Sequence, residues 1–253
     1  GDSPMRLTPD ATSLQNWASN VNLAVEDNDN GLVSTDEYLG VFYPSGFTSD
    51  NFGNNIVVPS SHMMLRTIAL SDQVSFPWFA PAGTRRGGIT NASSTGYISN
   101  EGEFVSTALN EGQRDTLYSN NVNPITFITG AGLVNYGQKT RFAGSSALDR
   151  INVARLVIYM RSQLNKLARP YVFEPNDKIT RDEIKAQAES LLLELVGNRA
   201  IYDFLVVCDE SNNTPTRIDR NELYLDIAIE PVKAVEFIYV PLRLKNTGEI
   251  AGL

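Results

Sequence analysis

Residue types that often carry chemistry are scarce in this sequence of 253 residues. The single cysteine, Cys208, excludes an internal disulfide framework, and the single histidine, His62, leaves a zinc site or a cysteine–histidine nucleophile pair without its usual partners. No apolar run approaches the roughly 20 residues that span a bilayer, so we expect no direct membrane insertion. Lys and Arg number 21 against 29 Asp and Glu, and the resulting net charge of −8 argues against a nucleic-acid partner. We expect His62 to lie in a helix and Cys208 to be a buried thiol in a strand.

The remaining composition is that of an ordinary globular protein, 42% hydrophobic and 20% charged, and the chain is long enough to bury a core. The residues Thr8-Pro9-Asp10 suit a helix start, and apolar residues at helical spacing predict a helix over 9–24. We interpret residues 1–34 as an N-terminal helix and connecting loop, the remnant of a longer chain, and residues 35–253 as a core domain.

The first half of the core domain alternates short strands with loops. The stretches "EYLGVFYP" (37–44) and "NIVVP" (55–59) predict strands that end at prolines, and "SSHMMLRTIAL" (60–70) predicts a helix. Gly, Ser, Asn and Pro dominate much of the region that follows, which predicts a loop-rich lobe over 76–123.

The last hundred residues have the clearest pattern. Ser146 with Asp149 predicts the start of one helix, and a capping box of Thr180 and Glu183 predicts the start of another that ends at Gly197. Three predicted strands follow, "YDFLVVC" (202–208), "ELYLDIAIEP" (222–231) and "VEFIYVPLRL" (235–244). The fold class is therefore α/β or α+β: a mixed β-sheet flanked by helices, with a loop-rich insertion and a C-terminal edge strand or arm.

Two stretches raise the alternative of a P-loop-like ATPase. Gly132 to Thr140 runs from an apolar strand through a glycine-rich turn to Lys-Thr, and "FLVVCDE" ends on Asp209, a candidate magnesium ligand. In the motif, however, Lys directly follows the second glycine, whereas Gln138 intrudes here and would rotate the lysine by about 100° on a helix. A structural turn is the favoured interpretation, and we expect no enzyme activity and no cofactor.

A second candidate site is a calcium loop in "EDNDNGLVSTDE" (26–37), where oxygen-bearing side chains and Gly31 occupy the positions of a twelve-residue loop. Its first ligand would be Glu26 rather than Asp, and strand-like residues follow it, so a solvated turn is favoured over a calcium-stabilised binding module. Carboxylates are numerous, but no spacing singles out a catalytic pair.

Several stretches taken in order resemble the contractile tail sheath proteins of bacteriophages. They are "YLGVFYP", "IVVPSSHMM", "WFAPAGTRRGG", "LYSNNVNPI" with "GAGLVNYGQKT", "DRINVARLVIYM", and a dense block from "VVCDESNNTPTRIDRNE" to "AVEFIYV". The resemblance covers roughly residues 35–245, with Ala154 at a position where the family has arginine. It makes the core domain one of sheath type.

The resemblance implies a structural subunit rather than an enzyme. Such subunits assemble helically around a tail tube and contract to drive the tube through the host envelope for genome delivery. The implied partners are neighbouring subunits, the tail tube protein, the baseplate and the tail terminator. The implied location is the virion, with assembly in the host cytoplasm.

The C-terminal strand and arm over 232–253 is the candidate self-assembly segment. Its strand is apolar on both faces, and Pro241 removes a backbone donor, which is typical of an edge position. We hypothesise that it adds to a neighbouring subunit's sheet, and the alternative is an edge strand of the home sheet. The residues inferred to carry this role are Val235, Phe237, Ile238, Tyr239, Val240 and Leu242.

Overall fold

The computed structural model describes residues 2–19, 36–142, 144 and 146–240. The helices are α1 (Ala11–Ser19), α2 (Ser60–Val74), α3 (Gly83–Arg86), α4 (Glu111–Ser119), α5 (Ile151–Ala168), α6 (Lys178–Gly197) and α7 (Pro215–Asp219), with 3-10 turns η1 (Ala147–Asp149) and η2 (Arg169–Tyr171). The strands are β1 (Phe42–Tyr43), β2 (Ser45–Ser49), β3 (Asn55–Val58), β4 (Ser94–Ile98), β5 (Phe104–Ser106), β6 (Asn123–Ile128), β7 (Gly132–Asn135), β8 (Ile201–Val207) and β9 (Asp226–Pro231).

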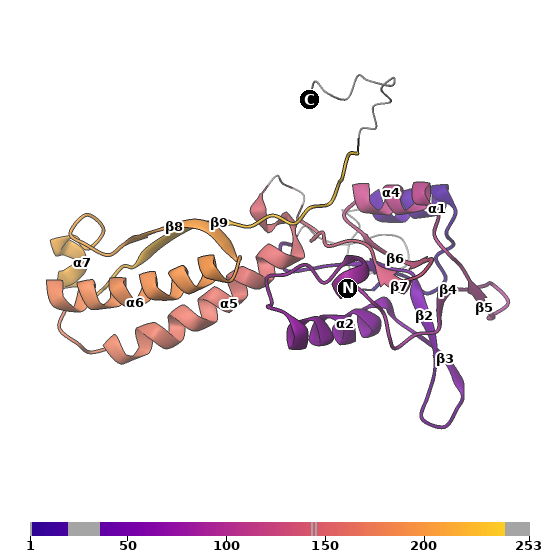
Figure 1. Cartoon of the computed structure of the whole chain (residues 1–253), viewed down its shortest axis with the longest axis horizontal. Coiled ribbons are helices and arrows are strands. Elements are labelled where there is room, and N and C mark those ends of the chain that lie inside the picture. The colour runs from indigo at the N-terminus through magenta and orange to yellow at the C-terminus, as the bar shows by residue number, and fades with distance from the viewer. Residues whose placement is uncertain (1, 20–35, 143, 145, 241–253) are drawn as a thin grey trace, which may run out of the picture.

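The molecule is elongated, with two lobes connected by the long helix α5 (Figure 1). The first lobe holds α1 to α4 and two sheets, with strand orders β1-β6-β7 and β3-β2-β4-β5. The second lobe holds most of α5, with α6, α7 and the antiparallel pair β8–β9. The β1–β6 pair is parallel and the other pairs are antiparallel, so the predicted mixed α/β class with sheets flanked by helices is confirmed, its strands being divided among separate sheets.

The second lobe is layered because α6 has apolar residues on more than one side. These residues pack against α5 and against the inner face of the β8–β9 sheet, so the core of this lobe lies around α6. The members of this core are Trp78, Leu156, Met160, Ala188, Leu192, Leu195, Ala200, Ile201 and Val206. The predicted alternation in the penultimate strand is present over β9, where Ile227 and Ile229 face inward and Asp226 and Glu230 face solvent.

Two predicted helix starts, those of α1 and α6, are wrong by a few residues because a different side chain supplies the cap. Asp10, not Thr8, caps α1 by accepting the Ser13 N–H at 2.8 Å, and hydrogen bonds from Ser13 and Thr8 lower the pKa of Asp10 to about 2. Asp177 caps α6 by accepting the Thr180 N–H at 2.9 Å, so Thr180 lies inside the helix instead of opening a capping box. The predicted end of the first helix lies outside the described residues.

Two further differences concern η1 and the loop-rich lobe. Ser146 caps η1, and α5 then begins at Ile151 after Arg150, which supplies no side-chain cap. The predicted loop-rich lobe contains strands β4 and β5 and helices α3 and α4, because β4 pairs with β2, a strand directly beyond Pro44 that the sequence pattern did not reveal. Short strands completed by distant partners leave little periodicity in the sequence.

The core assignment predicts a contrast between two adjacent leucines of α6. The Leu192 side chain is 0% exposed and Leu193 is 62% exposed. We expect Leu192→Ala to lower the free energy of unfolding by about 2–5 kcal/mol and Leu193→Ala by less than about 1 kcal/mol, because only the first leaves a cavity. Urea unfolding of both variants measures the difference, and equal losses would contradict the packing described.

Candidate functional site

The candidate site is the segment that leaves the β8–β9 sheet, residues 232–240, called the arm below. The Val232 N–H donates to the Ala200 carbonyl at 3.0 Å, and beyond it the described residues up to Val240 form no strand. The strand predicted over 235–244 is therefore absent from the described residues of the arm, and the alternative of an edge strand in the home sheet is not formed by them. The arm diverges from β9 and runs past the start of α5 towards the first lobe (Figure 1).

The arm presents a run of apolar side chains to solvent. Val235, Phe237, Ile238, Tyr239 and Val240 are between 69% and 87% exposed, whereas Leu242 lies outside the described residues. Because both faces of the segment are apolar, pairing beside β9 would still leave one row of side chains in water. Contiguous exposed apolar residues of this kind mark interaction surfaces.

One polar residue, Glu236, attaches the arm to the rest of the chain. Its carboxylate accepts from Arg150 Nε at 2.6 Å and Nη2 at 3.1 Å, and from Gln138 Nε2 at 3.3 Å. Arg150 also contacts Asp149 Oδ2 at 3.0 Å. This bidentate arrangement fixes both distance and orientation, so the arm leaves the body at a defined place. We call Glu236, Arg150 and Gln138 the clamp.

The surroundings of Glu236 keep it ionised. Partial burial by itself would raise the pKa of Glu236, but the hydrogen bonds and positive charge of Arg150, with hydrogen bonds from Tyr118 and Gln138, hold the pKa below its ordinary value of 4.5. Sequence reasoning missed the clamp. The one signal was an acidic residue interrupting an otherwise apolar run, "VEFIYV".

The geometry excludes the phosphate-loop alternative. Residues 125–135 form the β6–β7 hairpin, and residues 137–142, where the phosphate loop would need its helix, contain none. Lys139 Nζ donates to the Tyr118 carbonyl at 2.7 Å and lies 4.2 Å from the centre of the Tyr118 ring. Asp209 accepts from Ser211 in the turn after β8, so the two parts of the proposed nucleotide site lie in different lobes (Figure 1).

The metal and nucleophile candidates are resolved as far as the structure describes them. Among the described residues no group of three or more His, Cys, Asp or Glu side chains is placed to hold a metal ion, and most of the calcium loop 26–37 lies outside those residues. His62 lies in α2, as predicted, and Cys208 is a buried free thiol directly after β8 ends. None of the described helices combines the length and apolar character that a bilayer crossing requires.

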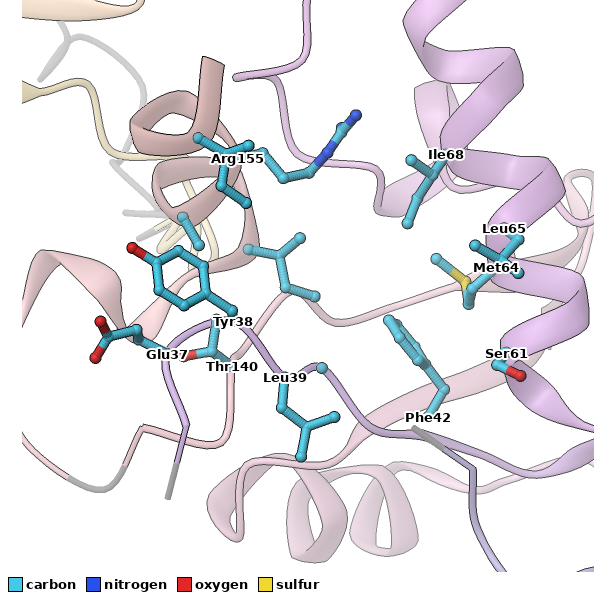
Figure 2. Close-up of a pocket in the computed structure, with 14 residues that line it drawn as sticks. Glu37, Tyr38, Leu39, Phe42, Ser61, Met64, Leu65, Ile68, Thr140 and Arg155 are labelled. Carbon is cyan, nitrogen blue, oxygen red and sulfur yellow. The ribbon is translucent and has the colours of Figure 1, made fainter. Parts of the chain in front are cut away.

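The first lobe also contains an apolar pocket of about 290 Å³ between α2, α5 and the segment that begins at Glu37. Figure 2 shows Met64 and Ile68 of α2 and Phe42 pointing into it, with Tyr38 at one side and Arg155 at its upper edge. Arg155 Nη2 pairs with Asp72 Oδ2 at 2.5 Å, while its buried Nη1 has no hydrogen-bond partner among the described residues. No sequence pattern indicated this pocket.

The family model that matches this chain covers the part that begins shortly before α5. Residues 144–245, which include α5, α6, the β8–β9 sheet and the arm, match the phage tail sheath C-terminal domain family. The chain is 35% identical over 249 residues to the tail sheath protein of Vibrio phage KVP40, covering 95% of this chain and 35% of that protein. It is 31% identical over 255 residues to the tail sheath protein of Enterobacteria phage T4, covering 98% of this chain and 36% of that protein.

Solved structures share the fold at lower identity. The sheath complex of an extracellular contractile injection system, PVC, in the contracted state matches with a TM-score of 0.71 at 18% identity, over 85% of this chain and 58% of that one. The helical sheath of the anti-feeding prophage in the contracted state matches with a TM-score of 0.71 at 18% identity, over 87% and 63%. The chain spans about a third of the length of the curated relatives that it matches. Residues 144–245 belong to the phage tail sheath C-terminal domain family, and nearly the whole chain is similar to phage tail sheath proteins.

Proposed function

We propose that this protein is a structural subunit of a contractile phage tail sheath, which assembles helically around the tail tube and contracts to drive it through the host envelope for genome delivery. Its partners are further sheath subunits, the tail tube protein, the baseplate and the tail terminator. It acts in the virion after assembly in the host cytoplasm, without nucleic acid, membrane insertion, cofactor or catalysis. The observation that carries the proposal is the exposed apolar arm within a domain of the sheath family.

The arm suits attachment by strand addition to a neighbouring subunit. The described β8–β9 sheet has two strands, so each strand has an edge whose backbone groups lack a ladder partner. A two-stranded sheet has only marginal stability by itself. An added strand supplies backbone hydrogen bonds, and its alternating side chains occupy both faces of the sheet. The same contact repeated from subunit to subunit is heterologous, and it builds an open helical array when its rotation does not close into a ring.

Contraction then requires that subunits rotate without losing their neighbours. The arm is joined to its own subunit at the clamp and to a neighbour through the added strand. The backbone of the few residues between these two points can change conformation as the subunits rotate. In this mechanism the energy is stored in the extended assembly, so nucleotide hydrolysis has no step to drive. Glu236 and Arg150 set the direction in which the arm leaves its own subunit.

Strand addition is tested by two substitutions at one exposed arm position. Ile238→Pro removes a backbone donor from the added strand, whereas Ile238→Ala keeps it. We expect proline to abolish polymerisation into hollow cylinders in electron micrographs and alanine to preserve it, with unchanged melting temperatures for both unassembled variants because Ile238 is 80% exposed. Cylinders formed by the proline variant at the wild-type concentration would refute strand addition.

The clamp is tested by hydrogen exchange of residues 233–240 in the unassembled protein. Glu236→Gln removes the charge that pairs with Arg150, so we expect faster exchange and a loss of roughly 1–2 kcal/mol of arm attachment. Because attachment lowers the pKa of Glu236, the stabilisation is fully present above pH 4.5 and is lost as the pH falls through the lowered value. Wild-type exchange should therefore approach that of the variant only in acid. Glu210→Gln, at an exposed turn residue with no ion pair among the described residues, is the matched control.

The nucleotide alternative is tested by calorimetry with ATP and Mg²⁺. Since Lys139 is bound to the Tyr118 carbonyl and Asp209 lies in the other lobe, we expect no binding heat for the wild type. Stoichiometric binding that disappears in Lys139→Ala would reinstate the ATPase.

A further inference from the structure

The connection between α5 and α6, at the far end of the second lobe, presents an aromatic side chain in an unfavourable backbone conformation (Figure 1). Phe173 has φ of 78°, a left-handed conformation that bulky residues rarely adopt, and its side chain is 102% exposed. The neighbouring Val172 is 61% exposed. The strain at Phe173 is offset by no packing within the described part of the chain, and strained exposed residues concentrate at functional sites.

The base of this connection is held by side-chain hydrogen bonds. Gln187 Nε2 of α6 donates to the Tyr171 hydroxyl at 2.6 Å, and Asn176 Nδ2 donates to the Glu222 carbonyl at 2.9 Å. A backbone bond from Glu174 N to Tyr171 O, 3.2 Å long, closes the turn around Phe173. Val172 and Phe173 are thus presented as a fixed projection, which we call the knob, and docking such a projection costs little ordering entropy.

The pocket of the first lobe has the character needed to receive the knob. It has a volume of about 290 Å³, and an engineered apolar cavity of about 150 Å³ holds a benzene molecule, so a phenyl ring and a neighbouring branched side chain fit. Met64, Ile68 and Phe42 point into it (Figure 2). Its lining also includes the exposed side chains of Leu65, Tyr38 and Ile158. Among the described residues, the opening is therefore an apolar surface in contact with water.

Charges around the two features are complementary. Glu174 directly follows the knob, is exposed, and forms no ion pair with any other described residue. Arg155 lies at the pocket edge, and its Nη1 is buried without an acceptor although Nη2 pairs with Asp72. A second carboxylate at this edge would give the guanidinium the acceptor that it lacks, with Arg155 turning slightly outward. Glu37, which also lines the pocket, lies beside Tyr38, away from the Arg155 guanidinium (Figure 2).

We propose that the Val172–Phe173 knob of one copy of this chain inserts into the α2–α5 pocket of a second copy, with Glu174 pairing with Arg155. The knob and the pocket lie in different lobes of one molecule, so one copy cannot satisfy both by itself (Figure 1). The contact is heterologous: each copy offers a knob to one neighbour and a pocket to another, and such a contact extends a helical array when its rotation does not close into a ring. It rests on the proposed sheath function and adds to it a contact separate from the arm.

Cross-linking between two separately prepared variants tests the contact. Val172→Cys marks the knob and Leu65→Cys marks the pocket rim, while the native Cys208 is 1% exposed and serves as the unreactive background in wild-type controls. A short bismaleimide is added to each variant alone and to their mixture. We expect covalent dimers in the mixture only, since a heterologous contact brings a knob to a pocket and never a knob to a knob.

Two further substitutions show whether the aromatic ring carries the contact. Phe173→Ala in the Val172→Cys background should lower the dimer yield at least tenfold. Phe52→Ala should leave the yield unchanged, because Phe52 is 90% exposed on the β2–β3 hairpin but lies away from the knob. Both residues are exposed, so melting temperatures should match the parent variant and confirm that the folded state is intact.

The outcomes separate this contact from the proposed function. Absence of mixed dimers, equal yields with and without the Phe173 ring, or dimers of Val172→Cys with itself would each overturn the knob contact. A pocket covered by another segment of a longer protein would protect Leu65→Cys and give the first of these results. Cylinders in electron micrographs report on the sheath function independently. If cylinders form without mixed dimers, the sheath function is retained and the knob contact is rejected. If mixed dimers form without cylinders, the knob contact is retained and the sheath function is rejected.

Discussion

The packing of the β8–β9 sheet against α6 is the contact on which the arrangement of the second lobe depends. Leu192 and Leu195 of α6 are buried against Ile201 and Val206 of β8, and α5 covers another side of the same helix. This packing fixes where β9 ends, and therefore where the arm begins. It also fixes the spacing of α5 and α6, and with it the position of the turn that carries Phe173.

Irregular segments in both lobes are held by asparagine side chains that replace missing backbone partners. Asn123, 0% exposed, donates to the Val41 and Lys139 carbonyls and accepts the Lys139 N–H, so the stretch after β7 is satisfied without a helix. Asn213 likewise donates to the Tyr224 carbonyl and accepts its N–H beside β9. Buried backbone groups need partners, and these amides supply them where no ladder exists.

The surface of the chain is apolar at separate places that its own core does not cover. The arm, the pocket between α2 and α5, and the turn around Phe173 lie far apart in the sequence and on different parts of the molecule. A subunit of a helical array needs several such contacts, each modest by itself, because a single strong interface would resist the rotations of contraction. Under the proposed sheath function, these surfaces would contact further copies of the chain.

The sequence by itself determined the family, the mixed α/β class, the helices around α2, α5 and α6, and the apolar arm, since these depend on local periodicity and on motifs in fixed order. Only the tertiary structure decided the rest. The strand β2 that pairs with β4 lies dozens of residues upstream of it, the clamp joins Glu236 to Arg150 across 86 residues, and the pocket is formed by side chains from separate segments of the chain. Such contacts arise from how elements pack in space, and nothing in local spacing specifies which distant residues will meet.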